Sequence, residues 1–132
     1  LIERYLKEHL YKSDHTMDAQ IAYAVNQINA HEGKISISHL MNEVNLCQRH
    51  FERKFKLHTG FTPQKYNSIV RFKNAIKILR NESSDNLLSV AVKAGYYDAS
   101  HLSREVKKLS GSTPNFFLSL PPDNETTIIY TK

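Results

Sequence analysis

Apolar residues recur every three or four positions along most of the chain, which is the spacing of one face of an α-helix. The clearest stretches lie at residues 17–30, 36–44, 47–58, 62–81, 87–94 and 99–110, and a shorter one starts at Pro114. We identify no stretch that alternates in the manner of a half-buried strand. The pattern therefore predicts an all-α fold of about seven helices.

The apolar positions of each stretch predict the face that the helix buries, because the opposite positions are mostly polar. These inward positions are Ile21, Ala24, Val25 and Ile28; Ile37, Leu40, Met41 and Val44; Phe51 and Phe55; Tyr66, Ile69, Val70, Ala75, Ile76 and Leu79; and Leu102 and Val106.

Residues that begin or end helices flank these stretches. Gly33 and Gly60 are expected to end helices. Asn45 and Gly95 stand where a tight turn needs a positive φ. Short helices on both sides of each turn predict two helix-turn-helix motifs. The expected N-terminal caps are Ser36, Thr62, Asn86 and Asp98.

One stretch of about seventeen residues occurs twice, since Cys47–Pro63 matches Asp98–Pro114 fifty-one positions later. The helices before the two copies match at an offset of fifty, so the second turn is one residue longer. The repeat predicts two related units in one small domain. Identical pairs are His50/His101, Arg53/Arg104, Lys56/Lys107, Gly60/Gly111, Thr62/Thr113 and Pro63/Pro114.

These boundaries divide the chain into five parts. The first helix-turn-helix unit is expected at residues 17–60, a linker helix at 62–81 and the second unit at 86–120. Residues 1–16 are interpreted as a linker or an N-terminal helix, with both alternatives open, and residues 121–132 as a tail. A rise of about 1.5 Å per residue makes the linker helix roughly 28 Å long.

The amino-acid composition limits the kinds of partner that the chain is expected to bind. The chain has 132 residues, enough for one domain with a core, and 18 Lys+Arg against 13 Asp+Glu. This excess favours an anionic partner, either nucleic acid or a membrane surface. No run of eighteen apolar residues spans a membrane, and a single cysteine suits a reducing compartment, so we expect a cytoplasmic protein. The chain begins at Leu1 rather than Met and shows no secretion signal, which suggests a fragment of a longer protein.

The repeated stretch places charged residues on one outward stripe of each copy. Any surface helix can carry such a stripe, but Arg and Lys recur here at the same offsets in both units. These residue types contact guanine edges and phosphates, and a helix fits the major groove of B-form DNA. The linker length also resembles the 34–36 Å or so of one DNA turn. The two stripes are Arg49, Glu52, Arg53 and Lys56, and Ser100, Ser103, Arg104 and Lys107.

Other kinds of site are weaker candidates. Cys47 and His50 form an i, i+3 pair that His39 could approach, but no second pair at zinc-finger spacing follows. We therefore expect no metal and no cofactor. No phosphate loop or nucleophile elbow occurs, so we expect no enzyme. A helical protein-interaction module without DNA binding is the main alternative, and RNA binding is disfavoured because no exposed aromatic platform is evident.

At these residues the sequence resembles the C-terminal DNA-binding domain of the AraC/XylS family of bacterial transcription regulators, over about residues 17–119. The resemblance implies seven helices and two recognition helices that enter successive major grooves. It also implies that double-stranded DNA and RNA polymerase are partners, and that effector binding or dimerisation belongs to a part missing from this fragment. The matching segments are 49–56, 60–66, 71–75, 91–96, 98–104, 107–108 and 111–114.

By position, the resemblance implies that residues in both copies of the repeated stretch contact DNA bases. It implies that Arg71 has a structural role and does not contact DNA. We add phosphate contacts from the lysines on or near these helices. The expected base-reading residues are Gln48, Arg49, Glu52, Arg53, Ser100, His101, Ser103 and Arg104, and the expected phosphate contacts are Lys56, Lys65, Lys107 and Lys108.

Three positions depart from the family pattern. Cys47 stands where Ser is usual and should cap its helix poorly. Val106 replaces a usual Phe, which predicts looser packing of the second unit, and Leu118 replaces a common Arg. Since the second stripe is also made of short side chains, we expect the first unit to supply most of the base specificity. The second unit should contribute mainly phosphate contacts.

Overall fold

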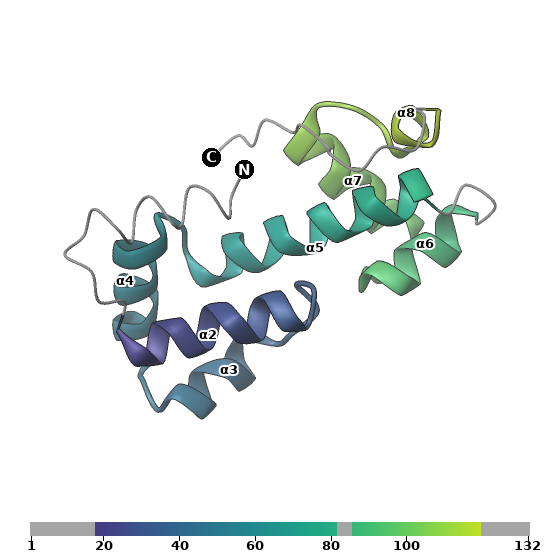
Figure 1. The fold of residues 1–132 in the computed structure, drawn as a ribbon. Coiled ribbons are helices and arrows are strands. Elements are labelled where there is room, and N and C mark those ends of the chain that lie inside the picture. Colours follow the sequence, from purple (N-terminus) through teal and green to yellow (C-terminus); the bar gives the residue numbers. More distant parts are fainter. Residues whose placement is uncertain (1–17, 82–85, 120–132) are drawn as a thin grey trace. The chain divides into compact units, whose positions relative to one another are not determined.

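The computed structural model describes residues 18–81 and 86–119, and within them it contains seven α-helices and no strand (Figure 1). This confirms the expected all-α class. The segments predicted at residues 1–16, 82–85 and 121–132 lie outside the described residues. The helices are α2 (Ala19–Ala30), α3 (Ile37–Val44), α4 (Gln48–Thr59), α5 (Pro63–Asn81), α6 (Leu87–Ala94), α7 (Ala99–Ser110) and α8 (Pro114–Leu118).

The chain forms two compact units, whose boundary between Ser68 and Ile69 falls inside α5. The first unit contains α2, α3, α4 and the first turns of α5. The second contains the remainder of α5 with α6, α7 and α8. Each unit therefore has one helix-turn-helix pair, α3–α4 or α6–α7, and draws on the long helix for part of its core.

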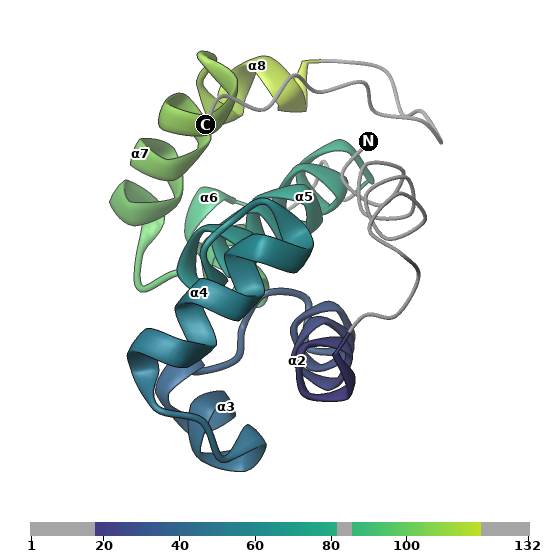
Figure 2. The same ribbon diagram turned by 90° about the vertical axis from the view of Figure 1, so that its left-hand side faces the viewer.

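The first unit is built on α2, which packs against both α3 and α4 (Figure 2). The inward positions predicted for these helices are buried, except that Met41 is half-buried. Phe55 lies at the centre, with its ring edge-on to Phe51 at 5.7 Å and to Tyr66 at 5.5 Å between centroids. Leu46, in the turn, is half-buried.

Polar contacts across the first unit fix the position of α3 and α4. The Gln20 amide donates to the last carbonyl of α3, that of Val44, at 2.7 Å. Lys54 on α4 donates to the Asp18 carboxylate at 2.8 Å, and Asp18 also caps α2 by accepting from the Gln20 backbone N–H at 2.9 Å. One carboxylate thus joins the start of α2 to the middle of α4.

The second unit has its own continuous core. Leu102 and Val106 of α7 are fully buried, as predicted, and they belong to a cluster with residues of α5, α6 and α8. Val106 is fully buried despite its small size, and the looser packing expected at this position stays a prediction. Leu118 packs against the same cluster as a partly buried residue.

The predicted N-caps all accept a hydrogen bond from a backbone N–H within the first turn of their helices. The distances are 3.3 Å for Ser36 to His39, 3.2 Å for Thr62 to Lys65, 2.8 Å for Asn86 to Ser89 and 2.7 Å for Asp98 to His101. Each cap satisfies one of the donors that a helix N-terminus leaves without an intrahelical partner.

Helix ends follow the predicted turn chemistry with one difference. Asn45 adopts the left-handed conformation at φ 58°, and Gly60 and Gly95 do so at φ 83° and φ 89°. Gly33, however, is not the cap of α2, because the helix ends at Ala30 and the cap is His31. Gly33 lies two residues further along and donates its N–H to Ile28 at 3.0 Å.

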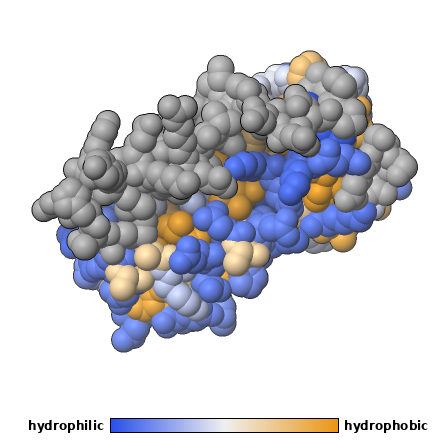
Figure 3. Space-filling view, viewed as in Figure 1, coloured by the Kyte–Doolittle hydropathy of each residue, from blue (hydrophilic) through white to orange (hydrophobic). Residues whose placement is uncertain are grey.

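Hydrophilic residues dominate the surface visible in Figure 3, and hydrophobic residues occupy limited areas there. Among the residues that the structure describes, no helix combines the length and the apolar character needed to cross a membrane.

Candidate nucleic-acid interface

The outward face of α4 carries the charged side chains predicted for it. Arg49, Arg53 and Lys56 are exposed, while Phe51 and Phe55 hold the opposite face in the core. This division follows from the helical period, because residues three and four apart share a face. The structure therefore presents three cations from consecutive turns of one helix to solvent.

Gln48 and Glu52 share this face but interact with each other. The Gln48 amide donates to the Glu52 carboxylate at 3.1 Å, one turn along the helix. Gln48 is exposed and Glu52 is half-buried. The pair leaves the amide oxygen of Gln48 and the second carboxylate oxygen of Glu52 available as acceptors, which suits the amino groups of adenine or cytosine.

The position of α4 within its unit depends on the ion pair between Lys54 and Asp18. Both side chains are about one quarter exposed. The hydrogen bond from Lys54, together with the backbone N–H of Gln20, lowers the pKa of the Asp18 carboxyl below its ordinary value. The ionised carboxylate is thus the form that the fold favours at neutral pH.

Cys47 stands at the N-cap of α4 and makes no side-chain cap hydrogen bond, as expected for a thiol. Asp98, its counterpart at α7, accepts from the His101 backbone N–H at 2.7 Å. The two copies of the repeat therefore differ in how firmly their first turns are held.

The outward face of α7 is less charged than that of α4. Ser100 and Arg104 are exposed and Ser103 is half-buried, so a long cationic side chain appears only from the second turn onward. The serine hydroxyls can donate or accept a hydrogen bond, but they reach less far from the helix than the arginines of α4.

His101 differs from the other expected base-reading residues because its ring is engaged inside its own unit. Its Nδ1 accepts from the Tyr97 backbone N–H at 3.4 Å, and its Nε2 lies 3.8 Å from a Glu105 carboxylate oxygen. The ring also stands edge-on to Tyr96, at 5.1 Å between centroids. These contacts suit a residue that positions the turn before α7.

Tyr96 anchors this turn in the core. It is 4% exposed, its hydroxyl donates to Glu105 at 3.3 Å, and the Arg71 guanidinium lies 5.5 Å from the centre of its ring. Burial, and then the nearby Glu105 carboxylate, raise the pKa of the Tyr96 phenol. Arg71 therefore has an internal contact that fits the structural role expected for it.

The four lysines expected to contact phosphate lie in different surroundings. Lys56 and Lys108 are exposed, and Lys65 is half-buried. Lys107 donates to the carbonyl of Gly111 at 2.9 Å, just past the C-terminus of α7. An ammonium group has three donors, so this bond leaves two for another acceptor.

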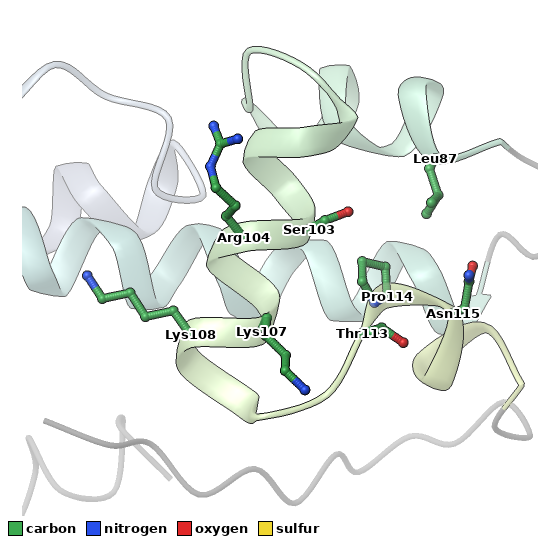
Figure 4. A pocket seen from close by; sticks show the side chains of 8 residues that line it. All are labelled: Leu87, Ser103, Arg104, Lys107, Lys108, Thr113, Pro114 and Asn115. Carbon is green, nitrogen blue, oxygen red and sulfur yellow. The ribbon is translucent and has the colours of Figure 1, made fainter.

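An open groove of about 650 Å³ lies beside the outward face of α7 (Figure 4). Three cations line it, and the residues of its lining include no carboxylate. The positive charge of these three side chains favours an anionic ligand over a neutral one. The lining consists of Ser103, Arg104, Lys107 and Lys108 of α7, Leu87 of α6, and Thr113, Pro114 and Asn115 at the start of α8.

The start of α8 was not anticipated as part of a site. Thr113 is exposed and makes no cap hydrogen bond, whereas its counterpart Thr62 caps α5. Lys108 also has no cationic counterpart, because Leu57 occupies that position of α4. A comparison of the two copies position by position would have revealed this difference from the sequence.

The residues considered for a metal site are not gathered by the fold. His39 pairs with Glu43, with 2.7 Å between Nε2 and a carboxylate oxygen. In the described ranges, no group of three or more His, Cys, Asp or Glu side chains is arranged to hold a metal ion.

Comparison with known proteins gives consistent results. A family described as a helix-turn-helix domain matches residues 40–119. The transcriptional activator RhaS of Escherichia fergusonii is 28% identical over 109 residues, which cover 82% of this chain and 39% of that protein. The raffinose operon regulatory protein RafR of Pediococcus pentosaceus is 29% identical over 82 residues, or 62% of this chain and 29% of that protein.

A solved structure shares the fold. The C-terminal domain of AraT, a response regulator from Geobacillus stearothermophilus, superposes with a TM-score of 0.73 at 18% identity. The match covers 84% of this chain and 93% of that domain. The chain thus spans less than half the length of the two regulators but nearly the whole of this domain.

Proposed function

Because the chain belongs to the AraC/XylS family of helix-turn-helix domains and is a DNA-binding domain of a bacterial transcription regulator, we propose that it binds specific double-stranded sequences through α4 and α7. We call these two the recognition helices. The observation that carries the proposal is the exposed row of Arg49, Arg53 and Lys56 on α4, opposite a fully buried face. Arginine pairs with guanine through two hydrogen bonds in the major groove.

The recognition helix α4 carries most of the base readout in this proposal. Arg49 and Arg53 supply donors to guanine, and Gln48 and Glu52 supply acceptors. The hydrogen bond between Gln48 and Glu52 supports this role, because it orders both side chains before DNA binds. The ordering lowers the conformational entropy that binding would otherwise cost.

The second recognition helix, α7, contributes through Ser100, Ser103 and Arg104 and through phosphate contacts. The groove beside it supports this assignment, since Lys107, Lys108 and Arg104 all line it. Thr113 adds a hydroxyl that is not used as a cap. Lys56 and Lys65 would contact phosphates beside α4 in the same way. We assign His101 a positioning role because its ring atoms are engaged within the unit.

The two recognition helices would occupy successive major grooves of one duplex. The repeat supports this proposal, as does the length of α5, whose 19 residues correspond to about 28 Å. We further propose that the protein acts in the cytoplasm by binding rather than catalysis. Contacts with RNA polymerase, and an effector-binding or dimerisation domain elsewhere in a longer chain, complete the proposal.

Duplex binding at increasing salt concentration tests this function. We expect the affinity to fall steeply with salt, because Lys and Arg release counterions from the phosphates they neutralise. One selected sequence should also outcompete random duplex by at least roughly a thousandfold. Retention that is insensitive to salt and equal on single strands would instead indicate a protein-interaction module.

A further inference from the structure

The turn between α6 and α7 contains one residue more than the turn between α3 and α4. Residues 45–47 join the first pair of helices, and residues 95–98 join the second. Gly95 corresponds to Asn45, since both begin their turn in the left-handed conformation, and Asp98 corresponds to Cys47 at the N-cap. Tyr97, directly before the cap, is the additional residue.

Tyr97 is also the most exposed of the large hydrophobic residues in the described part of the chain, at 88%. Its neighbour Tyr96 fills the core position of the turn, where it is 4% exposed. The fold therefore does not need Tyr97 for packing. A large aromatic side chain exposed to water directly before a recognition helix is available to contact a bound partner.

The backbone that carries Tyr97 is held in place. Its N–H donates to Nδ1 of His101 at 3.4 Å, and the next residue, Asp98, accepts from the backbone N–H of His101 at 2.7 Å. Both contacts involve the first turn of α7. The Tyr97 side chain therefore projects from a fixed point, and binding would order only its side-chain torsions.

The location of Tyr97 relative to α7 indicates what it would meet, and this step rests on the function proposed above. In helix-turn-helix proteins the N-terminal residues of the recognition helix lie nearest the base edges. The following outward residues, Ser100 and Ser103, are short and polar. An aromatic ring in this place would reach further towards the bases than either serine.

The apolar character of the Tyr97 ring indicates which base it would contact. The thymine C5-methyl group is the apolar feature of the major groove, and apolar side chains contact it. We propose that Tyr97 packs its ring against a thymine methyl in the groove bound by α7, and so specifies thymine at one position. A hydrogen bond from its hydroxyl to a phosphate is the competing role, which would strengthen binding to all sequences equally.

Single-position exchange of thymine for deoxyuridine tests the proposal, because it removes only the methyl group. The probe is a duplex selected from a random pool by the wild-type protein. We expect one exchange to weaken wild-type binding by roughly fourfold, the effect of burying about one methyl group. The same exchange should not affect Tyr97→Ala, and Tyr97→Phe should behave as the wild type does.

Leu88→Ala is the matched control, since Leu88 is an exposed apolar residue of the same unit, at 57%, but lies on α6. It should leave the response to deoxyuridine unchanged. The inference is overturned if no exchange distinguishes wild type from Tyr97→Ala, or if Tyr97→Phe weakens binding to every sequence alike. If either result occurs while the wild type still binds DNA in a salt-dependent and sequence-selective way, the proposed function stands and only the inference about Tyr97 fails. If the wild type does not bind DNA in this way, the proposed function and the inference both fail.

Discussion

The two recognition helices differ at the single residue that caps each of them. Asp98 holds the first turn of α7 through the His101 N–H, while the Cys47 thiol makes no such bond at α4. The helix with the larger set of arginines therefore begins without a side-chain cap. In compensation, the Lys54–Asp18 ion pair ties α4 to α2.

Replacing Cys47 with Ser should stabilise the first unit, because a hydroxyl can accept a backbone N–H that the thiol leaves without a side-chain partner. We expect the free energy of unfolding in urea to rise by about 1 kcal/mol. Asp98→Ala is the opposite control and should lower it by a similar amount. An unchanged midpoint for Cys47→Ser would show that water or another group already satisfies the first turn.

Replacing Asp18 with Asn isolates the ion pair with Lys54, since Asn caps a helix about as well as Asp. The pKa of Asp18 is lowered in the folded state, so its stabilisation is present above its ordinary value of 3.8 and is lost as the pH falls towards the lowered value. We expect Asp18→Asn to cost about 0.5 kcal/mol at pH 7 and progressively less as the pH falls below 3.8. Urea unfolding at a series of pH values measures the difference, and a cost that does not shrink below pH 3.8 would contradict the explanation.

At the scale of the elements, α4 and α7 have similarly buried inward faces but different outward residues. Their inward residues are equally buried, so the two helices are held against their cores in similar ways. Their outward residues differ, with Arg49 and Arg53 on α4 against Ser100 and Arg104 on α7. A groove with three cations lies beside α7 (Figure 4). We infer that α4 contributes more to sequence preference and α7 more to general affinity.

Removing one arginine from each helix compares these contributions. Arg53→Ala should relax the preference at one or two base positions, by about 1–3 kcal/mol per position. Arg104→Ala should weaken binding more evenly across sequences. Site selection followed by sequencing measures both effects, and circular dichroism checks that each variant folds. Greater loss of preference in Arg104→Ala than in Arg53→Ala would reverse the assignment.

At the scale of the whole molecule, two unlike helix-turn-helix units on one chain distinguish this protein from a symmetric dimer. A dimer presents the same helix twice and therefore recognises a palindrome. Here the outward residues of α4 and α7 differ in length and charge. We therefore expect one copy to recognise two different half-sites.

We therefore expect the selected DNA sites to lack two-fold symmetry and to bind one copy of this chain. Each half of the site should respond to variants of only one unit, with Arg53→Ala affecting one half and Tyr97→Ala the other. Analytical ultracentrifugation of the complex gives the stoichiometry, and selection gives the sequence. Palindromic sites occupied by two copies would contradict this expectation.

Much of this arrangement could be predicted from the chain alone. The helical period identified the buried faces of α2, α4 and α7, because burial of an amphipathic helix repeats every 3.6 residues. The capping residues identified where helices begin, since Ser36, Asn86 and Asp98 can accept backbone N–H bonds locally. Gly33 was misassigned because Glu32 also adopts a positive φ, at 56°, which is uncommon for a residue other than glycine.

The candidate site was predicted less completely. The stripe on α4 follows from periodicity, but the engagement of His101 with Tyr96, Tyr97 and Glu105 does not. The groove formed by α6, α7 and the start of α8 does not follow from periodicity either, because it requires residues from three helices. The longer second turn was visible in the repeat, yet only the structure shows which of its two tyrosines faces the core.

The sequence by itself determined the two helix-turn-helix units, the helices within them and the faces they bury, because spacing and capping act between residues close in the chain. The tertiary structure decided which polar side chains remain available for DNA. Lys54 is hydrogen-bonded to Asp18, and His101 is hydrogen-bonded to the backbone of the turn before α7. Tyr97 is exposed while Tyr96 is buried. Such contacts depend on which residues the packed helices bring together in space, and no local pattern specifies them.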